Sequence, residues 1–517
     1  MRIHAAQNLV SQTHTVDLLI VGGGINGSGI ARDAAGRGLR VCLVERSDLA
    51  AHTSSASTKL IHGGLRYLEH FEFRLVREAL AERERLLGIA PHIVRPMRFV
   101  LPHVSELRPR WQIRLGLLLY DHLGGRKRLP PSEPIRLDRD PTGAALKPGF
   151  VHGFTYSDCS VDDARLVVLN ALDAALRGAV ILPRTRLERA QAAGDGWRAT
   201  CVDVNSGRTI DVRARALINA TGCWVEPVRR GMGLKDFHPP RLVQGSHIVV
   251  DRLFPGEHAF LLQNPDRRVV FAIPYEDRFT LIGTTDVPFT GDLEAVSISP
   301  AEISYLCQTV NRFFKHSIGP ADVRWSYSGV RALQDDEAAE AAQVTRDYDL
   351  KLELAAAGTP VITVIGGKIT TYRKLAEAAL ALIRPFVGGT LESWTASAPL
   401  PGGDLPDGQT EIALDKFRQR WKFVPPHMLE RLARTYGTRV ELILADARSM
   451  ADLGECFGGD LTAAEVSYLR DTEWAFTAED VLWRRTKLGL TMANHNVLQL
   501  EAFMAAMVGE SHTRATV

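Results

Sequence analysis

Residues 22–27 of this 517-residue chain read Gly-Gly-Gly-Ile-Asn-Gly, a G-x-G-x-x-G pattern that restricts the local fold more than any other feature. An apolar run, residues 17–21, precedes the glycines, and a helix-compatible stretch, residues 25–37, follows them. In this context the first glycine permits a tight turn, the second lets the backbone approach a pyrophosphate, and the third lets the helix pack on the strand. Glu45 ends the next apolar run, at about the 20-residue offset where a carboxylate binds ribose hydroxyls. We therefore predict a dinucleotide-binding strand-turn-helix-strand unit whose contacts are Gly22, Gly24, Asn26, Gly27 and Glu45.

This pattern does not separate FAD from NAD, but three other segments favour FAD. Residues 219–222, Asn-Ala-Thr-Gly, resemble the late strand end that lies beside the first glycine turn in two-domain flavoproteins. Residues 53–59 offer several hydroxyl groups to a pyrophosphate or a flavin edge, although a helix cap or a plain loop has the same composition. Residues 365–371 place two glycines before a lysine, which can present N–H groups and a cation where negative charge develops on a flavin; a surface lysine is the alternative. These segments add the predicted FAD contacts Thr53, Ser54, Ser57, Lys59, Gly222, Gly367, Lys368 and Thr370.

The composition is that of a globular enzyme with two or three domains. Apolar residues make up 45% and charged residues 24% of the chain, and the net charge is only +2, so no global field attracts nucleic acid. The six cysteines are scattered without C-x-x-C spacing, which indicates neither a zinc site nor a disulfide framework. Residues 1–16 lack the apolar core of a secretory signal, and no apolar run approaches the roughly 20 residues needed to span a bilayer. We expect a reducing compartment, no bound metal and, at most, peripheral membrane contact.

The apolar spacing predicts the main elements after residue 60. Residues 71–87 and 161–170 have helical periodicity, whereas residues 245–285 alternate around turn signals, as an antiparallel sheet does. A further helix is expected at 372–383, and the Pro/Gly-rich residues 399–407 separate a mostly helical tail. The predicted fold class is α/β: a Rossmann-like FAD-binding domain (1–95, 150–225 and 325–395) interleaved with a mixed or antiparallel-sheet substrate domain (96–149 and 226–324), followed by a helical C-terminal domain (396–517).

Longer motifs show a resemblance to the aerobic, membrane-associated, FAD-dependent glycerol-3-phosphate dehydrogenases, which have the D-amino-acid-oxidase-like fold. The similar segments are spread over nearly the whole chain, at residues 22–27, 53–67, 156–159, 161–165, 245–250, 283–286, 327–331, 345–348, 366–374 and 480–487. The block from His62 to Tyr67 is far more specific than a short fingerprint. Thr58 stands where a second serine is expected, and Ile369 stands where a leucine is expected. The resemblance adds Leu60 and His62 to the expected FAD contacts, although a core histidine is an equally good interpretation of His62.

The resemblance implies that sn-glycerol 3-phosphate is oxidised to dihydroxyacetone phosphate as FAD is reduced. An anionic phosphate calls for arginine partners, and the matching positions are Arg66, Arg331 and Arg346, with Tyr67 beside them. His247 is the candidate base for the hydroxyl proton, with a structural histidine as the alternative. Lys368 and Arg331 are expected to act at the reacting centre. There Lys368 would stabilise the reduced flavin or orient the substrate hydroxyl.

The family passes its electrons to membrane ubiquinone, which implies a quinone partner and a place at the inner face of the cell membrane. Residues 111–128 combine a tryptophan, aliphatic residues and the basic cluster of Arg126, Lys127 and Arg128, so they are the candidate docking surface; an ordinary buried helix is the alternative. A peroxide-forming oxidase of the same fold and a non-catalytic FAD-binding protein remain open as functions. A homodimer is compatible with the sequence, which does not decide the oligomeric state.

Overall fold

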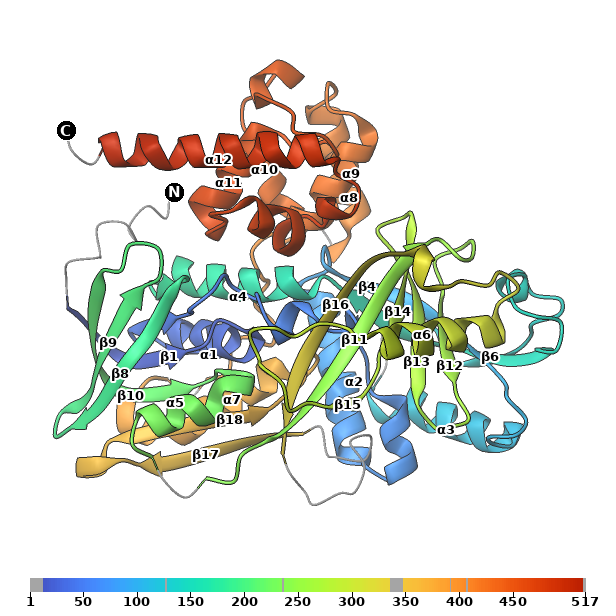
Figure 1. Cartoon of the computed structure of the whole chain (residues 1–517), viewed down its shortest axis with the longest axis horizontal. Helices are drawn as coiled ribbons and strands as arrows, with labels where there is room; N and C mark the ends of the chain where they lie inside the picture. The colour runs from blue at the N-terminus through green and yellow to red at the C-terminus, as the bar shows by residue number, and fades with distance from the viewer. Residues whose placement is uncertain are drawn as a thin grey trace.

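The computed structural model describes residues 13–125, 128–234, 237–334, 347–390, 392–405 and 408–514. Two sheets lie side by side, and a group of helices formed by the C-terminal part of the chain packs above them (Figure 1). One sheet is mainly parallel and carries helices, while the other is mainly antiparallel. This arrangement confirms the predicted α/β class with a C-terminal helical domain.

The first sheet contains the strand and helix on either side of the glycine turn. Five consecutive strands, from β18 to β7, are parallel, and the edge strand β17 is antiparallel to β18. The strand order is β17 (Tyr348–Leu354), β18 (Pro360–Gly366), β10 (Thr209–Asn219), β1 (His14–Val21), β2 (Val41–Val44) and β7 (Val180–Leu182). The hairpin of β8 (Thr185–Ala193) and β9 (Gly196–Asp203) joins through β10. Strand β1 therefore lies at the centre, next to β10 and β2, so the turn that follows it is at the middle of the sheet edge.

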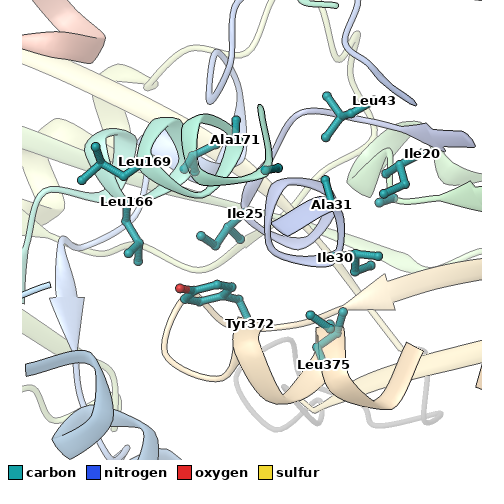
Figure 2. Close-up of a cluster of buried hydrophobic side chains, with 14 of the residues drawn as sticks. Ile20, Ile25, Ile30, Ala31, Leu43, Leu166, Leu169, Ala171, Tyr372 and Leu375 are labelled. Atoms are coloured by element: carbon teal, nitrogen blue, oxygen red, sulfur yellow. The ribbon is translucent and has the colours of Figure 1, made fainter. Parts of the chain in front are cut away.

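Helices cover one face of this sheet because alternate residues of β1 point to opposite sides. Leu18 and Ile20 belong to a core shared with α1 (Ile25–Gly36), α4 (Asp163–Leu176) and α7 (Tyr372–Val387). Leu19 and Val21 instead pack with the β8–β9 hairpin on the other face. Figure 2 shows α1 between α4 and α7, with Ile30 and Ala31 of α1 in the shared core. The small residues of α1 let both helices approach it closely.

The second sheet confirms the antiparallel pattern predicted for residues 245–285. Its order is β15 (Val287–Pro288), β11 (Arg241–Asp251), β14 (Phe279–Gly283), β13 (Val269–Tyr275), β12 (Ala259–Gln263), β4 (Val94–Pro102), β6 (His152–Val161) and β3 (Leu60–Ile61). Strand β16 (Val323–Leu333) pairs with β11, β5 (Glu133–Arg136) pairs with β6, and α6 (Pro300–Phe313) packs on the sheet. Strands β3 and β6, and all of β16 except its first two residues, fall within the ranges expected for the FAD-binding domain, yet they pair here. The chain thus crosses between the sheets more often than the predicted boundaries imply.

Two helices lie at the end of the molecule opposite the C-terminal domain (Figure 1): α2 (Phe73–Ile89) and α3 (Arg110–Leu123). The short helices η2 (Thr53–Ser55) and η3 (Leu65–His70) lie in the chain between β2 and α2, and α5 (Val225–Gly231) follows β10. The C-terminal domain has its own apolar core. Its helices are α8 (Thr410–Arg420), α9 (Pro426–Tyr436), α10 (Val440–Leu444), α11 (Ala463–Glu473), η11 (Asp480–Arg485) and α12 (Asn494–Arg514). Among the described helices, none has the length and apolar character needed to cross a membrane.

Buried ion pairs connect the C-terminal domain to loops of the first sheet. Asp48, three residues after Glu45, accepts hydrogen bonds from Arg484 at 2.6 Å and from Arg485 at 2.8 Å. At the start of α4, Asp162 pairs with Lys487 at 3.0 Å. Asp48 is 2% exposed and Arg485 is fully buried, so each charge depends on its partner for solvation. These pairs fix the C-terminal domain against the loop that follows β2.

Asp48→Asn is expected to lower the free energy of unfolding by about 3–5 kcal/mol, because it leaves the buried Arg485 without a carboxylate partner among the described residues and removes one of the carboxylates that pair with Arg484. Urea unfolding followed by tryptophan fluorescence measures the change. Asp415→Asn is the matched control, since Asp415 is 68% exposed and pairs with Arg418 at the surface; we expect a change below about 1 kcal/mol there. Equal stability of the two variants would show that the buried pairs do not hold the domains together.

Candidate functional site

A cavity of about 610 Å³ lies where the two sheets meet. Its walls come from the glycine turn after β1, from residues 44–67, from the end of β16 and from residues 366–370. The first and the last of these segments are more than 300 residues apart in the chain. The volume and the mixed apolar and polar walls are typical of a cofactor or small-molecule site.

The glycine turn has the geometry that its sequence pattern predicts. Gly22 has φ +111°, and a Cβ added to Gly27 would lie 1.9 Å from the Gly22 carbonyl oxygen, so neither position accepts a side chain. Helix α1 starts after Gly24 with no acidic residue in its first turn. Gly22, Gly24 and Asn26 line the cavity, whereas Gly27 packs behind the turn, the place that the third glycine of the pattern fills. The positive N-terminal end of α1 therefore faces the cavity and fits a pyrophosphate.

Glu45 lines the cavity and also holds the turn. Its Oε2 accepts a hydrogen bond from the Gly23 N–H at 2.7 Å, and its Oε1 accepts one from the Ser47 N–H at 2.8 Å. Burial raises the pKa of Glu45, and these two hydrogen bonds act in the opposite direction. The structure thus gives Glu45 a contact that the sequence analysis did not anticipate, and its bond to a ribose stays a prediction.

Aromatic and basic side chains next to Glu45 form a wall that sequence reasoning missed. The Arg46 guanidinium lies 4.1 Å from the centre of a Trp224 ring, and the ring of His52 lies 4.6 Å from that of Trp224. Burial lowers the pKa of His52 to about 4, so this histidine is neutral near pH 7. The aromatic surface of Trp224 and the neutral His52 beside Glu45 suits a stacked adenine, although the two rings are tilted by 56°. Trp224 follows the Asn-Ala-Thr-Gly motif by two residues, which is the one sequence signal that could have indicated it.

The hydroxyl-rich segment lines the cavity, but the protein already uses several of its hydroxyls. Ser54 Oγ accepts from the Ile25 N–H at 3.0 Å, and Thr53 Oγ1 donates to the Val330 carbonyl at 2.7 Å. Ser57 Oγ donates to Asp163 at 2.7 Å. These bonds fix the segment against α1, β16 and α4.

Lys59 departs from the sequence prediction because it lies behind the cavity wall. Its Nζ donates to Asp163 at 2.8 Å and to the Ser55 carbonyl at 2.9 Å, and the residue is 5% exposed. The described contacts give Lys59 a structural role in holding residues 53–59.

The Gly-Gly-Lys turn closes the far end of the cavity. Asn26 Nδ2 donates to the Gly366 carbonyl at 3.0 Å, which joins this turn to the first glycine turn. Lys368 Nζ lies 3.9 Å from the centre of the Tyr67 ring. The other predicted contacts that line the cavity are Leu60, His62, Gly222, Gly367 and Thr370.

The same end of the cavity carries cations. Arg66, Arg331 and Lys368 all line it. Arg331 pairs with Asp286 at 2.5 Å. Asp286 lies in segment 283–286, which carries part of the family resemblance, but the sequence did not single it out as a site residue. Arg66 and Lys368 have no carboxylate partner in the part of the chain that the structure describes, so this end has an excess of positive charge. The fourth predicted residue, Arg346, lies outside the described residues.

His247, the predicted base, is fully buried and does not line the cavity. Its Nε2 lies 3.0 Å from Oγ1 of Thr58, and Thr58 does line the cavity. Burial lowers the pKa of His247 well below its usual value, and the positive charges of Arg331 and Lys59 lower it further. Among the described residues, His247 is therefore linked to the cavity through Thr58. The sequence indicated Thr58 as part of the hydroxyl-rich segment 53–59 and as a departure from an expected serine, but did not single it out as a site residue.

A dinucleotide turn, a long cavity between two sheets and a cation-rich end together define a flavin-dependent oxidoreductase. Residues 17–373 match the family described as FAD dependent oxidoreductase, and residues 393–515 match the C-terminal domain of alpha-glycerophosphate oxidase. The chain belongs to this family, in the branch of the FAD-dependent glycerol-3-phosphate dehydrogenases, and FAD is its cofactor.

Two relatives and one solved structure illustrate the similarity. A glycerol-3-phosphate dehydrogenase of Pseudomonas aeruginosa is 52% identical and covers 96% of this chain and 98% of its own length. A D-erythritol 1-phosphate dehydrogenase of Brucella abortus is 49% identical, and the match covers 92% of this chain and 95% of that protein. The structure of the glycerol-3-phosphate dehydrogenase from Bacillus halodurans complexed with FAD has a TM-score of 0.74 and 26% identity, with 97% of this chain and 90% of that chain covered.

Glu45→Gln is expected to weaken FAD binding about 10- to 100-fold. The glutamine amide lacks the negative charge of the carboxylate that accepts the hydrogen bond from the Gly23 N–H. Hydrogen bonds to charged groups contribute about 1.5–3 kcal/mol. Titration of the FAD-free protein with FAD, followed by flavin fluorescence, measures the dissociation constant. Glu226→Gln is the control, because Glu226 pairs with Arg230 on a helix surface. An unchanged constant for Glu45→Gln would refute the role of this carboxylate.

Proposed function

We propose that this protein oxidises sn-glycerol 3-phosphate to dihydroxyacetone phosphate with FAD as the first electron acceptor, and that membrane quinone is the second. The relatives named for glycerol-3-phosphate support the substrate. The observation that carries the proposal is the pair of cations, Arg66 and Lys368, that face the FAD cavity without a carboxylate partner among the described residues.

A phosphate monoester supplies the negative charge that this end of the cavity lacks. Arginine binds phosphate oxygens through two parallel N–H bonds, whereas lysine acts as a point charge. In our proposal Arg66 and Arg331 hold the phosphate, and Asp286 orients Arg331. Lys368 is held over the Tyr67 ring, from which it can contact the substrate hydroxyl.

Bound FAD supplies the two-electron acceptor, and the chain supplies orientation and a base. The residues that hold FAD are those of the two glycine turns, with Glu45 at the ribose end. Oxidation of a secondary alcohol also requires a group that takes the hydroxyl proton. His247 is our candidate, since its lowered pKa keeps the ring neutral and able to accept a proton near pH 7.

A longer polyol phosphate is the second candidate substrate. The D-erythritol 1-phosphate dehydrogenase of Brucella abortus is nearly as similar to this chain as the relatives named for glycerol 3-phosphate. Both substrates carry one phosphate, so the cation-rich end suits either. The two differ by one hydroxylated carbon, and a comparison of rates separates them.

Anaerobic mixing of the FAD-loaded protein with each substrate tests the proposal. We expect sn-glycerol 3-phosphate to bleach the flavin absorbance with a larger second-order rate constant of reduction than D-erythritol 1-phosphate, and glycerol to be a poor substrate because it lacks the phosphate. Turnover with an artificial electron acceptor gives kcat/KM. Arg66→Gln should lower kcat/KM for the phosphorylated substrate about 10- to 100-fold, the loss of one charge-assisted contact.

Arg324→Gln is the control for this experiment. Arg324 lies on β16, the strand that carries Arg331, but pairs with Asp251 at the surface. Absence of bleaching by any phosphorylated polyol would favour a non-catalytic FAD-binding protein. Oxygen uptake and peroxide formation at the rate of turnover, without quinone, would favour an oxidase.

We propose further that the protein binds the inner face of the cell membrane through α3. Trp111, Leu115, Leu118 and Leu119 lie on one side of this helix, and each is at least 40% exposed. Phe71, at 77% exposure, lies nearby between η3 and α2. An exposed apolar helix face of this kind is typical of an interfacial membrane contact.

The position of α3 relative to the cavity supports a quinone acceptor. Tyr120 of α3 is buried, accepts a hydrogen bond from the Gly63 N–H at 2.8 Å and donates to Asp158 at 2.8 Å. Asp158 and Gly64 line the FAD cavity. A membrane surface at α3 would therefore bring a lipid-soluble acceptor close to the flavin. Of the predicted basic cluster, Arg128 is exposed, and Arg126 and Lys127 lie outside the described residues.

Replacement of both Trp111 and Leu115 by serine is expected to weaken binding to phosphatidylcholine–phosphatidylglycerol vesicles at least about 10-fold, because each apolar side chain contributes about 1.5–3 kcal/mol when it leaves water. Co-sedimentation measures binding, and reduction of a water-soluble dye should stay unchanged. Leu498→Ser, at a site on α12 that is 65% exposed, is the control. Unaltered co-sedimentation of the double variant would exclude this surface.

A further inference from the structure

Thr58 lies between the cavity and the buried His247. Its Oγ1 lies 3.0 Å from His247 Nε2. Thr58 lines the cavity, but His247, at 0% exposure, does not. A group in the cavity can therefore meet the threonine hydroxyl, whereas it cannot touch the imidazole.

The strands around His247 leave it no other polar contact among the described residues. Its ring stacks on Tyr327 of β16, with ring centres 4.8 Å apart and an angle of 15° between the planes. On β14, a Cβ added to Gly283 would lie 2.0 Å from His247 Cδ2, so the ring covers the backbone there. The buried Nδ1 has no hydrogen-bond partner in the described part of the chain. Among the described residues, Thr58 is the side chain through which a proton can pass between this ring and the cavity.

Burial, and in addition the positive charges around the ring, lower the pKa of His247 and keep the ring neutral. Lys59 and Arg331 are the cations that lower its pKa in addition to burial, and each has a carboxylate partner, Asp163 and Asp286 respectively. With Nδ1 protonated, Nε2 accepts the hydrogen bond from the Thr58 hydroxyl. The same hydroxyl oxygen keeps lone pairs that can accept a further hydrogen bond, and Thr58 lines the cavity.

We propose that Thr58 relays the hydroxyl proton of the substrate to His247, an inference that rests on the proposed function. The C2–H bond breaks and its electron pair and hydrogen leave to the flavin as a hydride. The substrate O–H bond breaks as its proton moves to Thr58 Oγ1, and the original Thr58 proton moves to His247 Nε2. The products are a carbonyl group, reduced flavin and an imidazolium, so atoms and electrons balance.

The substrate phosphate assists this relay through charge. Arg331 is one of the cations that disfavour an imidazolium at His247. A phosphate bound by Arg331 offsets that charge and raises the pKa of His247 toward its usual value. His247 is therefore a stronger base when a phosphorylated substrate is bound than when glycerol is bound.

Thr58→Val removes the hydroxyl and keeps the shape of the side chain. We expect the rate of anaerobic flavin reduction by sn-glycerol 3-phosphate to fall about 100-fold or more, the usual contribution of positioned proton transfer. Thr58→Ser keeps the hydroxyl and should stay within about threefold of wild type. Thr435→Val is the matched control, because Thr435 donates to the Arg431 carbonyl in the C-terminal domain. Thr58→Ala replaces the valine variant if that variant does not retain FAD.

Two further measurements separate a relay from a packing role. In FAD-loaded protein with 15N-labelled histidine, the Nε2 resonance should shift in Thr58→Val and stay in place in Thr58→Ser. In wild type and in Thr58→Ser, the rate of flavin reduction should fall as the pH decreases, because an imidazolium cannot accept a proton. The residual rate of Thr58→Val should not fall at low pH in this way.

A hydroxyl-free variant that retains FAD and reduces it within about threefold of wild type would overturn the relay, as would an Nε2 resonance unchanged in Thr58→Val. Failure of the wild-type protein to be bleached would instead overturn the proposed function, so the two failures are distinguishable.

Discussion

The close approach of Gly27 to the Gly22 carbonyl is the constraint on which the site depends. It places the first turn of α1 directly against the end of β1, so that the positive end of the helix opens into the cavity. Glu45 fixes the same turn through the Gly23 N–H, and Asn26 ties it to Gly366. Both glycine turns are thereby held in register, which is necessary for a ligand that spans them.

The C-terminal domain supports this arrangement from outside. Arg484 and Arg485 hold Asp48 in the loop that begins with Glu45, and Arg165 of α4 forms a buried pair with Glu473. Buried pairs of this kind contribute little net energy but strongly resist the loss of either partner. The domain therefore positions the ribose end of the cavity although it lies outside the FAD cavity wall.

An aromatic stack links the same domain to the reacting end. Trp483 of η11 stacks on Trp325 at 4.5 Å, Trp325 packs on Tyr327 at 5.1 Å, and Tyr327 stacks on His247. The orientation of the buried imidazole is thus set by packing that begins in the C-terminal domain. This explains how a ring with a single hydrogen-bond partner among the described residues keeps one orientation.

The sequence by itself determined the fold class, the cofactor and part of the cavity wall, because these depend on local patterns. The glycine turn, the residue Glu45 and the segments 53–62 and 366–370 carry their geometry in short runs of residues. Long motifs also indicated the cationic residues Arg66, Arg331 and Lys368. In the structure all three line the same cavity.

Only the tertiary structure decided which side chains face the ligand. Lys59 and His247 lie behind the wall because Asp163 and Tyr327 hold them there, and those partners come from α4 and β16. The same pairing brings Thr58 to the front and Trp224 beside Glu45. Lys59 has φ +58°, so the chain turns at this residue and no strand or helix period applies to residues 58–59. Spacing along the chain therefore cannot distinguish Thr58 from Lys59. Contacts between segments nearly 200 residues apart make that choice.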